Sequence, residues 1–267
     1  MATVGRLCDK PRMPSHHETV VDQFSRQAVP FSTAAPIKDR EALQLLVDAS
    51  GAGPDDEVLD VACGPGLVAC AFARVVRHVT GIDLTPAMLA RAAEVAREQQ
   101  VTNVTWRHGD VLPLPFADRS FSIVVARFAF HHFQDPGAVL AEMRRVCRPG
   151  GRVVVADLLA SADPAKAAAF HRMEVLRDPS HARALPLAEL RDLFPARGLR
   201  VAGETRYGMD VELDAVLERS FPVPGSEPEI RRLFDAALPD DGMGLDVRRQ
   251  DGRIWFTFPV AVLTAVV

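Results

Sequence analysis

The chain has 267 residues, of which 48% are hydrophobic and 25% charged, and its formal net charge is −4 at pH 7. This composition is ordinary for a soluble globular protein, and a chain of this length can bury a substantial core without disulfides. A nucleic-acid-binding surface needs a clustered excess of lysine and arginine, whereas this chain has 31 basic and 35 acidic residues. We therefore predict a folded protein with no nucleic-acid partner.

The four cysteines, Cys8, Cys63, Cys70 and Cys147, include no Cys-x-x-Cys pair and have no accompanying histidine-rich spacing. This pattern predicts neither a disulfide framework nor a zinc site, and it fits a reducing compartment. No apolar leader is visible, and no apolar run approaches the roughly 20 residues of a membrane-spanning helix. The sequence therefore predicts a cytoplasmic protein with no membrane span and no bound metal.

Two helices are predicted near the amino terminus. Residues 1–18 are polar and are predicted to be a loose lead-in, whereas 20–30 and 40–49 carry apolar residues at helical spacing. A stretch rich in glycine then ends the second helix. We predict that residues 1–50 form an amino-terminal helical lid and that residues 51–267 form the main domain.

Short apolar segments alternate with helical segments in the next hundred residues. Two of these helices are predicted to begin at a proline, Pro86 after Thr85 and Pro136 after Asp135, where a helix needs no backbone N–H. Strands that alternate with helices form a parallel sheet covered on both faces. The fold class predicted is therefore α/β, with a doubly wound sheet. Its strands are predicted at 58–63, 78–84, 104–108, 122–126 and 152–158.

The last hundred residues have a looser pattern. Pro259 lies inside the final apolar run and predicts a bulge or an early end of that strand. Residues 208–252 are longer than a usual connection, so we predict an inserted helical segment that contributes to substrate choice or to a homodimer. Predicted elements of this region are a helix at 186–194, a strand at 199–207, helices at 214–219 and 227–237, and a strand at 253–263.

Polar groups and glycines gather where three of the predicted strands end. The first strand runs into a turn with Gly64 and Gly66, the second ends at Asp83, and the third is followed by Asp110. In a doubly wound sheet, ligands bind at these carboxyl ends, and an acidic residue about 20 positions after a glycine turn suits ribose hydroxyls. The three features together predict a site for a nucleoside. The glycines alone leave a dinucleotide open, because the turn with Ala69 passes the weaker form of that pattern.

Four segments resemble a known family. They are VLDVACGPG, VTGIDLTPAML, HGDVLPLPFADRSFSIVVARFAFHHF and RPGGRVVVAD. Together they are similar to the class I S-adenosylmethionine (SAM)-dependent methyltransferases, in particular those related to the ubiquinone/menaquinone C-methyltransferases. The similarity covers residues 20–160 well and the rest in outline. It implies a Rossmann-like sheet of seven strands, mostly parallel with the last strand antiparallel, and SAM as the cofactor.

The resemblance also implies roles for residues at the methionine end of SAM. Asp60, Ala62 and Gly64 would line the methionine moiety, with Gly66 in the same turn. Arg127, just after the fourth strand, would lie beside the methionine end, where many relatives use backbone groups. Ala62 departs from the commoner glycine, but it is small.

A second set of residues is implied for the nucleoside end. Asp83 would bind both ribose hydroxyls, with Leu84 and Met88 against the adenine. Asp110 would accept a hydrogen bond from the adenine amine, and the Val111 backbone would contact the ring edge. The alternative for the two aspartates is a helix cap or a turn.

Candidates for acceptor chemistry follow the fourth and fifth strands. His131 and His132 are suited to take a proton near neutral pH, and Asp157 ends the fifth strand. The alternative is that the two histidines only pack the loop against the cofactor. Tyr207 is predicted to be half-buried with its hydroxyl in water. An apolar acceptor pocket is suggested by several phenylalanines, Phe24, Phe31, Phe128, Phe130, Phe133 and Phe170.

The function predicted is transfer of a methyl group from SAM to a carbon, oxygen or nitrogen atom of a small apolar or aromatic acceptor. One alternative is a methyltransferase-like protein that binds SAM in a structural or regulatory role and transfers nothing. Another is a methyltransferase acting on RNA or protein, which the acidic balance disfavours.

Overall fold

The computed structural model describes residues 14–267. The first helix, α1 (His16–Thr33), begins inside the segment predicted to be a loose lead-in. It begins there because Ser15 and Glu18 form a capping box that satisfies backbone N–H groups at the helix start. Cys8 and the rest of the predicted lead-in before residue 14 lie outside the described residues. A second helix, α2 (Arg40–Ser50), is capped by Asp39 and ends at Gly51.

The sheet is the predicted doubly wound one, and its last strand is antiparallel to both neighbours. The strand order is β3-β2-β1-β4-β5-β9-β7. The prediction of seven strands is wrong in number, because two short strands, β6 and β8, pair with β5 and β9 outside that order. The strands are β1 (Glu57–Val61), β2 (His78–Asp83), β3 (Val104–His108), β4 (Phe121–Arg127), β5 (Cys147–Ala160), β6 (Leu185–Pro186), β7 (Arg200–Glu212), β8 (Arg248–Gln250) and β9 (Arg253–Val266).

Helices cover both faces of this sheet, because alternate side chains of each strand point to opposite faces. In β4, Ile123 and Val125 pack into the core shared with α2, α3 and α4, whereas Val124 and Ala126 pack into the core shared with α5 and α7. The helices that follow the strands are α3 (Leu67–Phe72), α4 (Pro86–Glu98), α5 (Pro136–Val146) and α7 (Leu187–Asp192), with short 3-10 turns η1 (Phe130–His132) and η2 (Pro195–Arg197).

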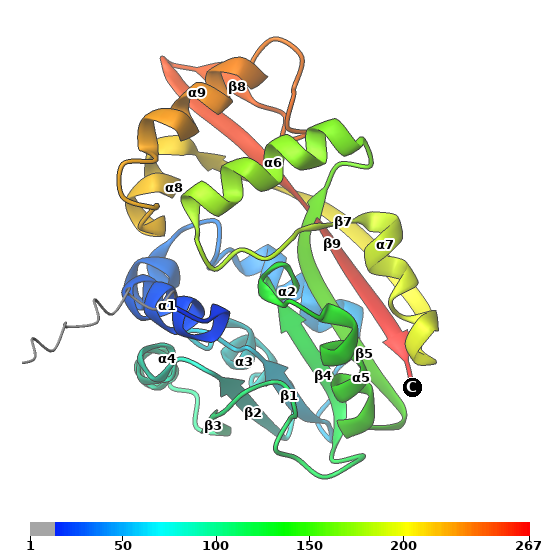
Figure 1. The fold of residues 1–267 in the computed structure, drawn as a ribbon. Coiled ribbons are helices and arrows are strands. Elements are labelled where there is room, and N and C mark those ends of the chain that lie inside the picture. The colour runs from blue at the N-terminus through cyan, green and yellow to red at the C-terminus, as the bar shows by residue number, and fades with distance from the viewer. Residues whose placement is uncertain (1–13) are drawn as a thin grey trace, which may run out of the picture.

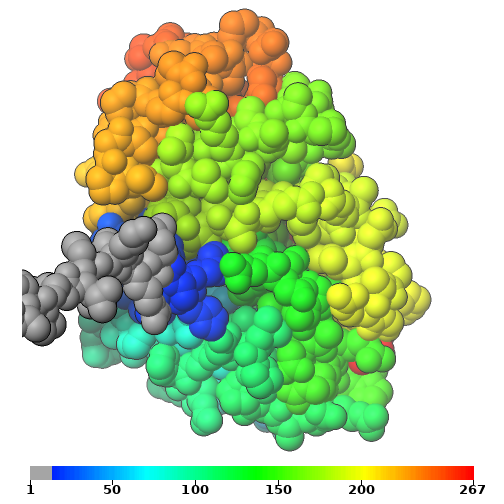
Figure 2. Space-filling model, viewed as in Figure 1, coloured from blue at the N-terminus to red at the C-terminus, as the bar shows by residue number. Residues whose placement is uncertain are grey.

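A helical layer stands on one end of the sheet, and strands β7 and β9 extend into it (Figure 1). The connection between these strands, where we predicted an insertion at 208–252, contains α8 (Leu213–Ser220), α9 (Glu227–Ala237) and β8. Helix α6 (Pro164–Arg177), which we did not predict, packs against α9. In the space-filling view the orange residues of α9 form the top of the molecule, above the green surface of α6 (Figure 2).

Pro259 does not interrupt β9, contrary to the prediction. It stays in register opposite Gly208 of β7, while pairing with β5 begins only at Val260. At Pro259 the edge of β9 away from β7 therefore has no partner strand, and proline, which has no N–H, is tolerated at such an edge. Across residues 14–267, none of the helices has the length and apolar character needed to cross a membrane.

Candidate active site

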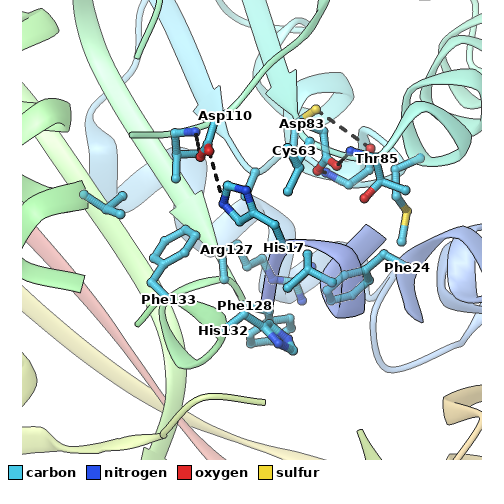
Figure 3. A pocket seen from close by; sticks show the side chains of 18 of the residues that line it. His17, Phe24, Cys63, Asp83, Thr85, Asp110, Arg127, Phe128, His132 and Phe133 are labelled. Carbon is cyan, nitrogen blue, oxygen red and sulfur yellow. Dashed lines mark hydrogen bonds and ion pairs between the residues drawn. The ribbon is translucent and has the colours of Figure 1, made fainter. Parts of the chain in front are cut away.

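A cavity of about 310 Å³ lies at the carboxyl ends of β1, β2 and β4 and beside the turn after β3. Helix α1 contributes the opposite wall, with Val20, Phe24 and Phe31 among its lining residues. We call this space the main cavity. Figure 3 shows His17 of α1 reaching Asp110, with Phe24 of the same helix also directed into the site. The sheet and the amino-terminal helix therefore form one site together.

The turn after β1 lines the main cavity from Ala62 to Pro65 and continues into Gly66. Gly64 and Gly66 have φ angles of 50° and 78°, which glycine adopts without strain. A Cβ atom on Gly66 would lie 2.6 Å from the Trp106 ring, so only glycine fits there. Ala62 has a φ angle of 53° although it carries a side chain. Such backbone strain is typical of functional sites.

Asp83 connects the ends of the first two strands. Its carboxylate accepts hydrogen bonds from the backbone N–H groups of Gly64 and Thr85, each at 2.8 Å. Burial raises the pKa of Asp83 above its usual value, and these two hydrogen bonds oppose the rise. The carboxylate borders the main cavity, and its remaining lone pairs can accept from hydroxyl groups.

Asp110 also borders the main cavity, and each of its two carboxylate oxygens has a partner. Oδ1 accepts from the backbone N–H groups of Val111 at 2.6 Å and Leu112 at 3.2 Å. Oδ2 lies 3.1 Å from Nε2 of His17 on α1. The Val111 N–H, predicted to contact a ring edge, is therefore held by Asp110 in this structure.

Arg127 ends β4 and carries a buried guanidinium with Tyr207 as a neighbour. Its Nη1 donates to the Ile37 carbonyl at 2.8 Å, while its Nε and Nη2 are buried with no hydrogen-bond partner in the described chain. The side chain is 8% exposed and stacks 4.2 Å from the centre of the Phe128 ring. Buried donors of a cation are costly when unpaired, so a carboxylate in the main cavity would be stabilised here.

Two predicted residues lie behind the cavity wall. Asp60 is 1% exposed, does not border the main cavity, and has one oxygen, Oδ2, without a hydrogen-bond partner in the described residues. Burial raises its pKa to about 8, which favours the protonated form at neutral pH. Tyr207 is half-buried as predicted, but its hydroxyl is buried rather than in water and has no hydrogen-bond partner within residues 14–267.

His131 and Asp157 form a buried pair. Nδ1 of His131 lies 2.6 Å from Oδ1 of Asp157, and the backbone N–H of His131 donates to Oδ2 at 2.8 Å. Burial disfavours the charged imidazole, but the Asp157 carboxylate outweighs it and the pKa of His131 is raised. With Nδ1 held by the carboxylate, Nε2 is the ring nitrogen left to accept a proton.

His132 has a different environment. Its Nδ1 lies 3.1 Å from the carbonyl oxygen and 3.1 Å from the hydroxyl of Ser180. Burial, together with the neighbouring His131, lowers the pKa of His132 to about 4. His132 is therefore neutral at pH 7 and a weak base, whereas His131 is the stronger one.

A second cavity of about 60 Å³, the inner chamber, lies behind the main cavity. His131, Arg177, Asp178 and Arg219 are among its lining residues. Five residues line both spaces and form the boundary between them: Phe24, Phe31, Ile37, Phe128 and His132.

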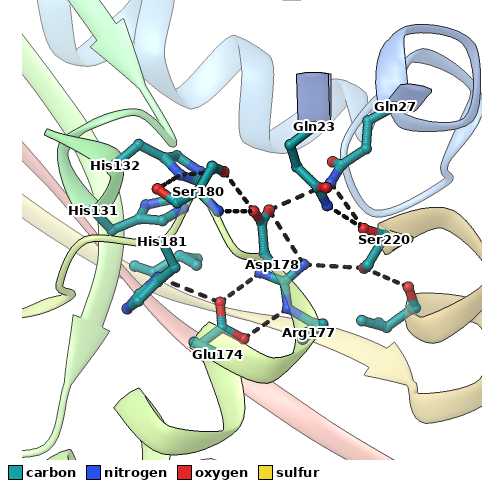
Figure 4. Close-up of polar contacts among 12 residues, drawn as sticks. Gln23, Gln27, His131, His132, Glu174, Arg177, Asp178, Ser180, His181 and Ser220 are labelled. Atoms are coloured by element: carbon teal, nitrogen blue, oxygen red, sulfur yellow. Dashed lines mark hydrogen bonds and ion pairs between the residues drawn. The ribbon is translucent and has the colours of Figure 1, made fainter. Parts of the chain in front are cut away.

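Buried polar side chains surround the inner chamber (Figure 4). Arg177 contacts Glu174 at 2.5 Å and donates to the Ser220 hydroxyl at 3.0 Å. Asp178 accepts from the N–H and hydroxyl of Ser180. Residues of α1 join this network, since Gln23 and Gln27 both donate to the Ser220 carbonyl. The sequence interpretation missed these residues, most of which lie on or after the unpredicted helix α6.

Most predicted site residues meet at the main cavity, and some do not. Asp60, Gly66, His131 and Asp157 do not line it. Of the phenylalanines, Phe130 and Phe170 are core residues. The predicted residues that line the main cavity are Ala62, Gly64, Asp83, Leu84, Met88, Asp110, Val111, Arg127 and His132, with Phe24, Phe31, Phe128 and Phe133.

Known proteins resemble this chain in sequence. A family model described as a methyltransferase domain matches residues 59–155. The uncharacterized methyltransferase YcgJ of Bacillus subtilis is 31% identical over 207 residues, which cover 78% of this chain and 82% of that protein. A demethylmenaquinone methyltransferase of Renibacterium salmoninarum is 39% identical over 114 residues, covering 43% of this chain and 46% of the relative.

Solved structures resemble it in fold. The crystal structure of YcgJ from Bacillus subtilis has a TM-score of 0.79 at 28% identity, covering 85% of this chain and 97% of that one. A geranyl diphosphate methyltransferase in complex with SAM is 18% identical and has a TM-score of 0.60. The match covers 85% of this chain and 84% of the methyltransferase chain. The second likeness concerns the fold alone.

Proposed function

Because the chain belongs to the SAM-dependent methyltransferases, with SAM as its cofactor, we propose that it methylates a small, mainly apolar or aromatic acceptor bound beside the main cavity. The observation that carries this proposal is the boundary between the two cavities. Phe24, Phe31 and Phe128 form an apolar wall there, and His132 adds a polar group beside them. Aromatic rings of an acceptor pack well against such a wall.

The main cavity fits the cofactor. The carboxylates of Asp83 and Asp110 suit the ribose hydroxyls and the adenine amine, and the unpaired Nε and Nη2 of Arg127 suit the methionine carboxylate. Bound SAM supplies a methyl group made electrophilic by the sulfonium. The remaining task of the protein is to hold the acceptor in line and to exclude water.

An acceptor that reacts through a hydroxyl group must lose the hydroxyl proton. We assign the removal of this proton to His131. Nε2 is the ring nitrogen that His131 leaves free, and the residue lines the inner chamber. Asp157 orients the ring and strengthens it as a base. His132, with its pKa near 4, separates the two cavities and orients the acceptor.

Aromatic acceptors are supported by the relatives. Two of the similar proteins are named for demethylmenaquinone and for 2-phytyl-1,4-naphtoquinone, and both names describe quinones. The matched stretch is 43% of this chain in both cases, so the acceptor itself is tested directly.

The test is a panel of phenols and hydroquinones incubated with SAM and the full-length protein, with release of S-adenosylhomocysteine as the readout. We expect release above the acceptor-free rate with at least one aromatic acceptor. Asp83→Ala serves as the inactive control, because the loss of charge-assisted hydrogen bonds should weaken SAM binding by about 10-fold or more. Tight SAM binding without turnover on any aromatic or aliphatic acceptor would refute the proposed acceptor class.

A further inference from the structure

The inner chamber contains more polar groups than an apolar acceptor requires, and most of them are already paired. His131 is held by Asp157, Arg177 by Glu174, and Asp178 by Ser180. These pairs leave little hydrogen-bonding capacity for a ligand. Within the described part of the chain, Arg219 is the one cation lining the chamber that has no such partner.

Arg219 lies in the last turn of α8 and is partly buried. Within residues 14–267 its only hydrogen bond runs from Nη1 to the Ala215 carbonyl of its own helix, at a long 3.4 Å. No carboxylate of residues 14–267 forms an ion pair with it. Burial and the nearby charge of Arg177 lower the pKa of Arg219 to about 10, so it remains charged at neutral pH.

A partly buried cation without a counter-ion is unfavourable, and a second cation nearby adds repulsion. An arriving anion would remove both penalties. The chamber is small, at about 60 Å³, and its other lining residues include Leu158, Met209 and Phe258. A planar carboxylate fits such a space, and arginine binds carboxylates through two parallel hydrogen bonds.

We propose that the methyl acceptor carries a carboxylate group, which enters the inner chamber and binds Arg219. The apolar body of the acceptor then lies between Phe24, Phe31 and Phe128, with its reacting group at the boundary between the two cavities. Arg219 is in this role a specificity-determining residue on the segment that joins β7 and β9. This proposal takes one point from the proposed function, namely that the acceptor binds beside the main cavity.

Benzoate and benzamide test this inference, because they match in shape and differ in charge. Both are titrated by calorimetry into the full-length protein saturated with S-adenosylhomocysteine. We expect benzoate to bind about 10-fold or more tighter than benzamide, as for a charge-assisted arginine contact. Equal affinities, or no benzoate binding, would overturn the proposal.

Substitutions identify the residue responsible. Arg219→Leu should remove the preference for benzoate and Arg219→Lys should keep part of it, whereas Arg172→Leu, on the exposed surface of α6, should change nothing. An unchanged preference in Arg219→Leu would contradict the assignment. If that variant does not fold, the wild-type comparison and Arg219→Lys still decide the question.

The outcome is separable from that of the proposed function. Arg219→Leu should leave S-adenosylhomocysteine binding unchanged, because Arg219 does not line the main cavity. Failure of every phenol, including those that carry a carboxylate, with an intact benzoate preference would contradict the proposed acceptor class and leave the carboxylate site standing.

Discussion

His17 and Asp110 join the first turn of α1 to the turn after β3, with 3.1 Å between Nε2 and Oδ2. One residue earlier, Nε2 of His16 lies 2.7 Å from the His132 carbonyl. These two contacts hold the start of α1 over the main cavity. Because Asp110 is also expected to accept from the adenine amine, the position of the helix and the binding of the cofactor depend on the same carboxylate.

His17→Ala should loosen the start of α1. One of the two contacts is lost, so backbone hydrogen exchange of the first turns should become faster, while the core strands stay unchanged. Exchange measured by mass spectrometry checks this, with His78→Ala as the control, since His78 bonds to Thr105 of the neighbouring strand β3 and not to α1. Unaltered exchange in residues 16–24 would show that the contact does not hold the helix.

Arg127→Met should weaken cofactor binding through the methionine carboxylate alone. We expect the dissociation constant of S-adenosylhomocysteine to rise about 10-fold or more, the usual scale for a lost charge-assisted hydrogen bond. The affinity for 5′-methylthioadenosine, which has no carboxylate, should stay the same. Equal losses for both ligands would indicate instead that Arg127 acts by holding the Ile37 carbonyl.

Asp157→Asn should change the pH dependence of methyl transfer. In the wild type, kcat/KM should rise with pH through the raised pKa of His131, because only the neutral ring can take a proton. Removing the carboxylate charge lowers that pKa, so the rise should move to lower pH and the plateau should fall by about 100-fold. Titration of the His131 ring by NMR gives the pKa directly, and an unshifted profile would exclude His131 as the base.

Glu174→Gln should destabilise the fold. Glu174 is fully buried against Arg177, and breaking a buried ion pair from one side costs about 3 kcal/mol or more. Urea unfolding measures the loss. The matched control is Glu189→Gln, which breaks the exposed pair with Arg183 and should cost less than about 1 kcal/mol. Similar losses in the two variants would mean that burial of the pair does not matter.

The sheet and the cofactor half were predictable because their signals are local. Alternating apolar strands and helices give the layers, and Asp83 and Asp110 follow strand ends in the sequence itself. Helix α6 escaped prediction because Glu174 lies on its buried face beside Phe170 and Met173, which breaks the apolar stripe that identifies a helix. The Asp163-Pro164 start was the signal that could have found it.

The surroundings of the two histidines were not predictable in the same way. His131 and His132 could be singled out as neighbours, but their pKa values differ for reasons the sequence does not show. Asp157, 26 positions along the chain, raises the pKa of His131, whereas burial and the neighbouring His131 lower the pKa of His132. Gln27 and Asp178 are 151 positions apart. Contacts between such distant side chains depend on the packed structure, and no spacing rule anticipates them.

The ladder between β7 and β9 has a practical consequence. Glu212 and Trp255 are paired at its upper end, so the segment that leaves one strand and returns to the other begins and ends at neighbouring positions. A segment with adjacent ends can be exchanged for one of another length with little effect on the strands that carry it. Residues 213–252 can therefore be grafted between related proteins, provided that the graft keeps the contacts of Ser220 with α1 and Arg177, so that the Arg219 wall is redesigned while the cofactor half stays as it is.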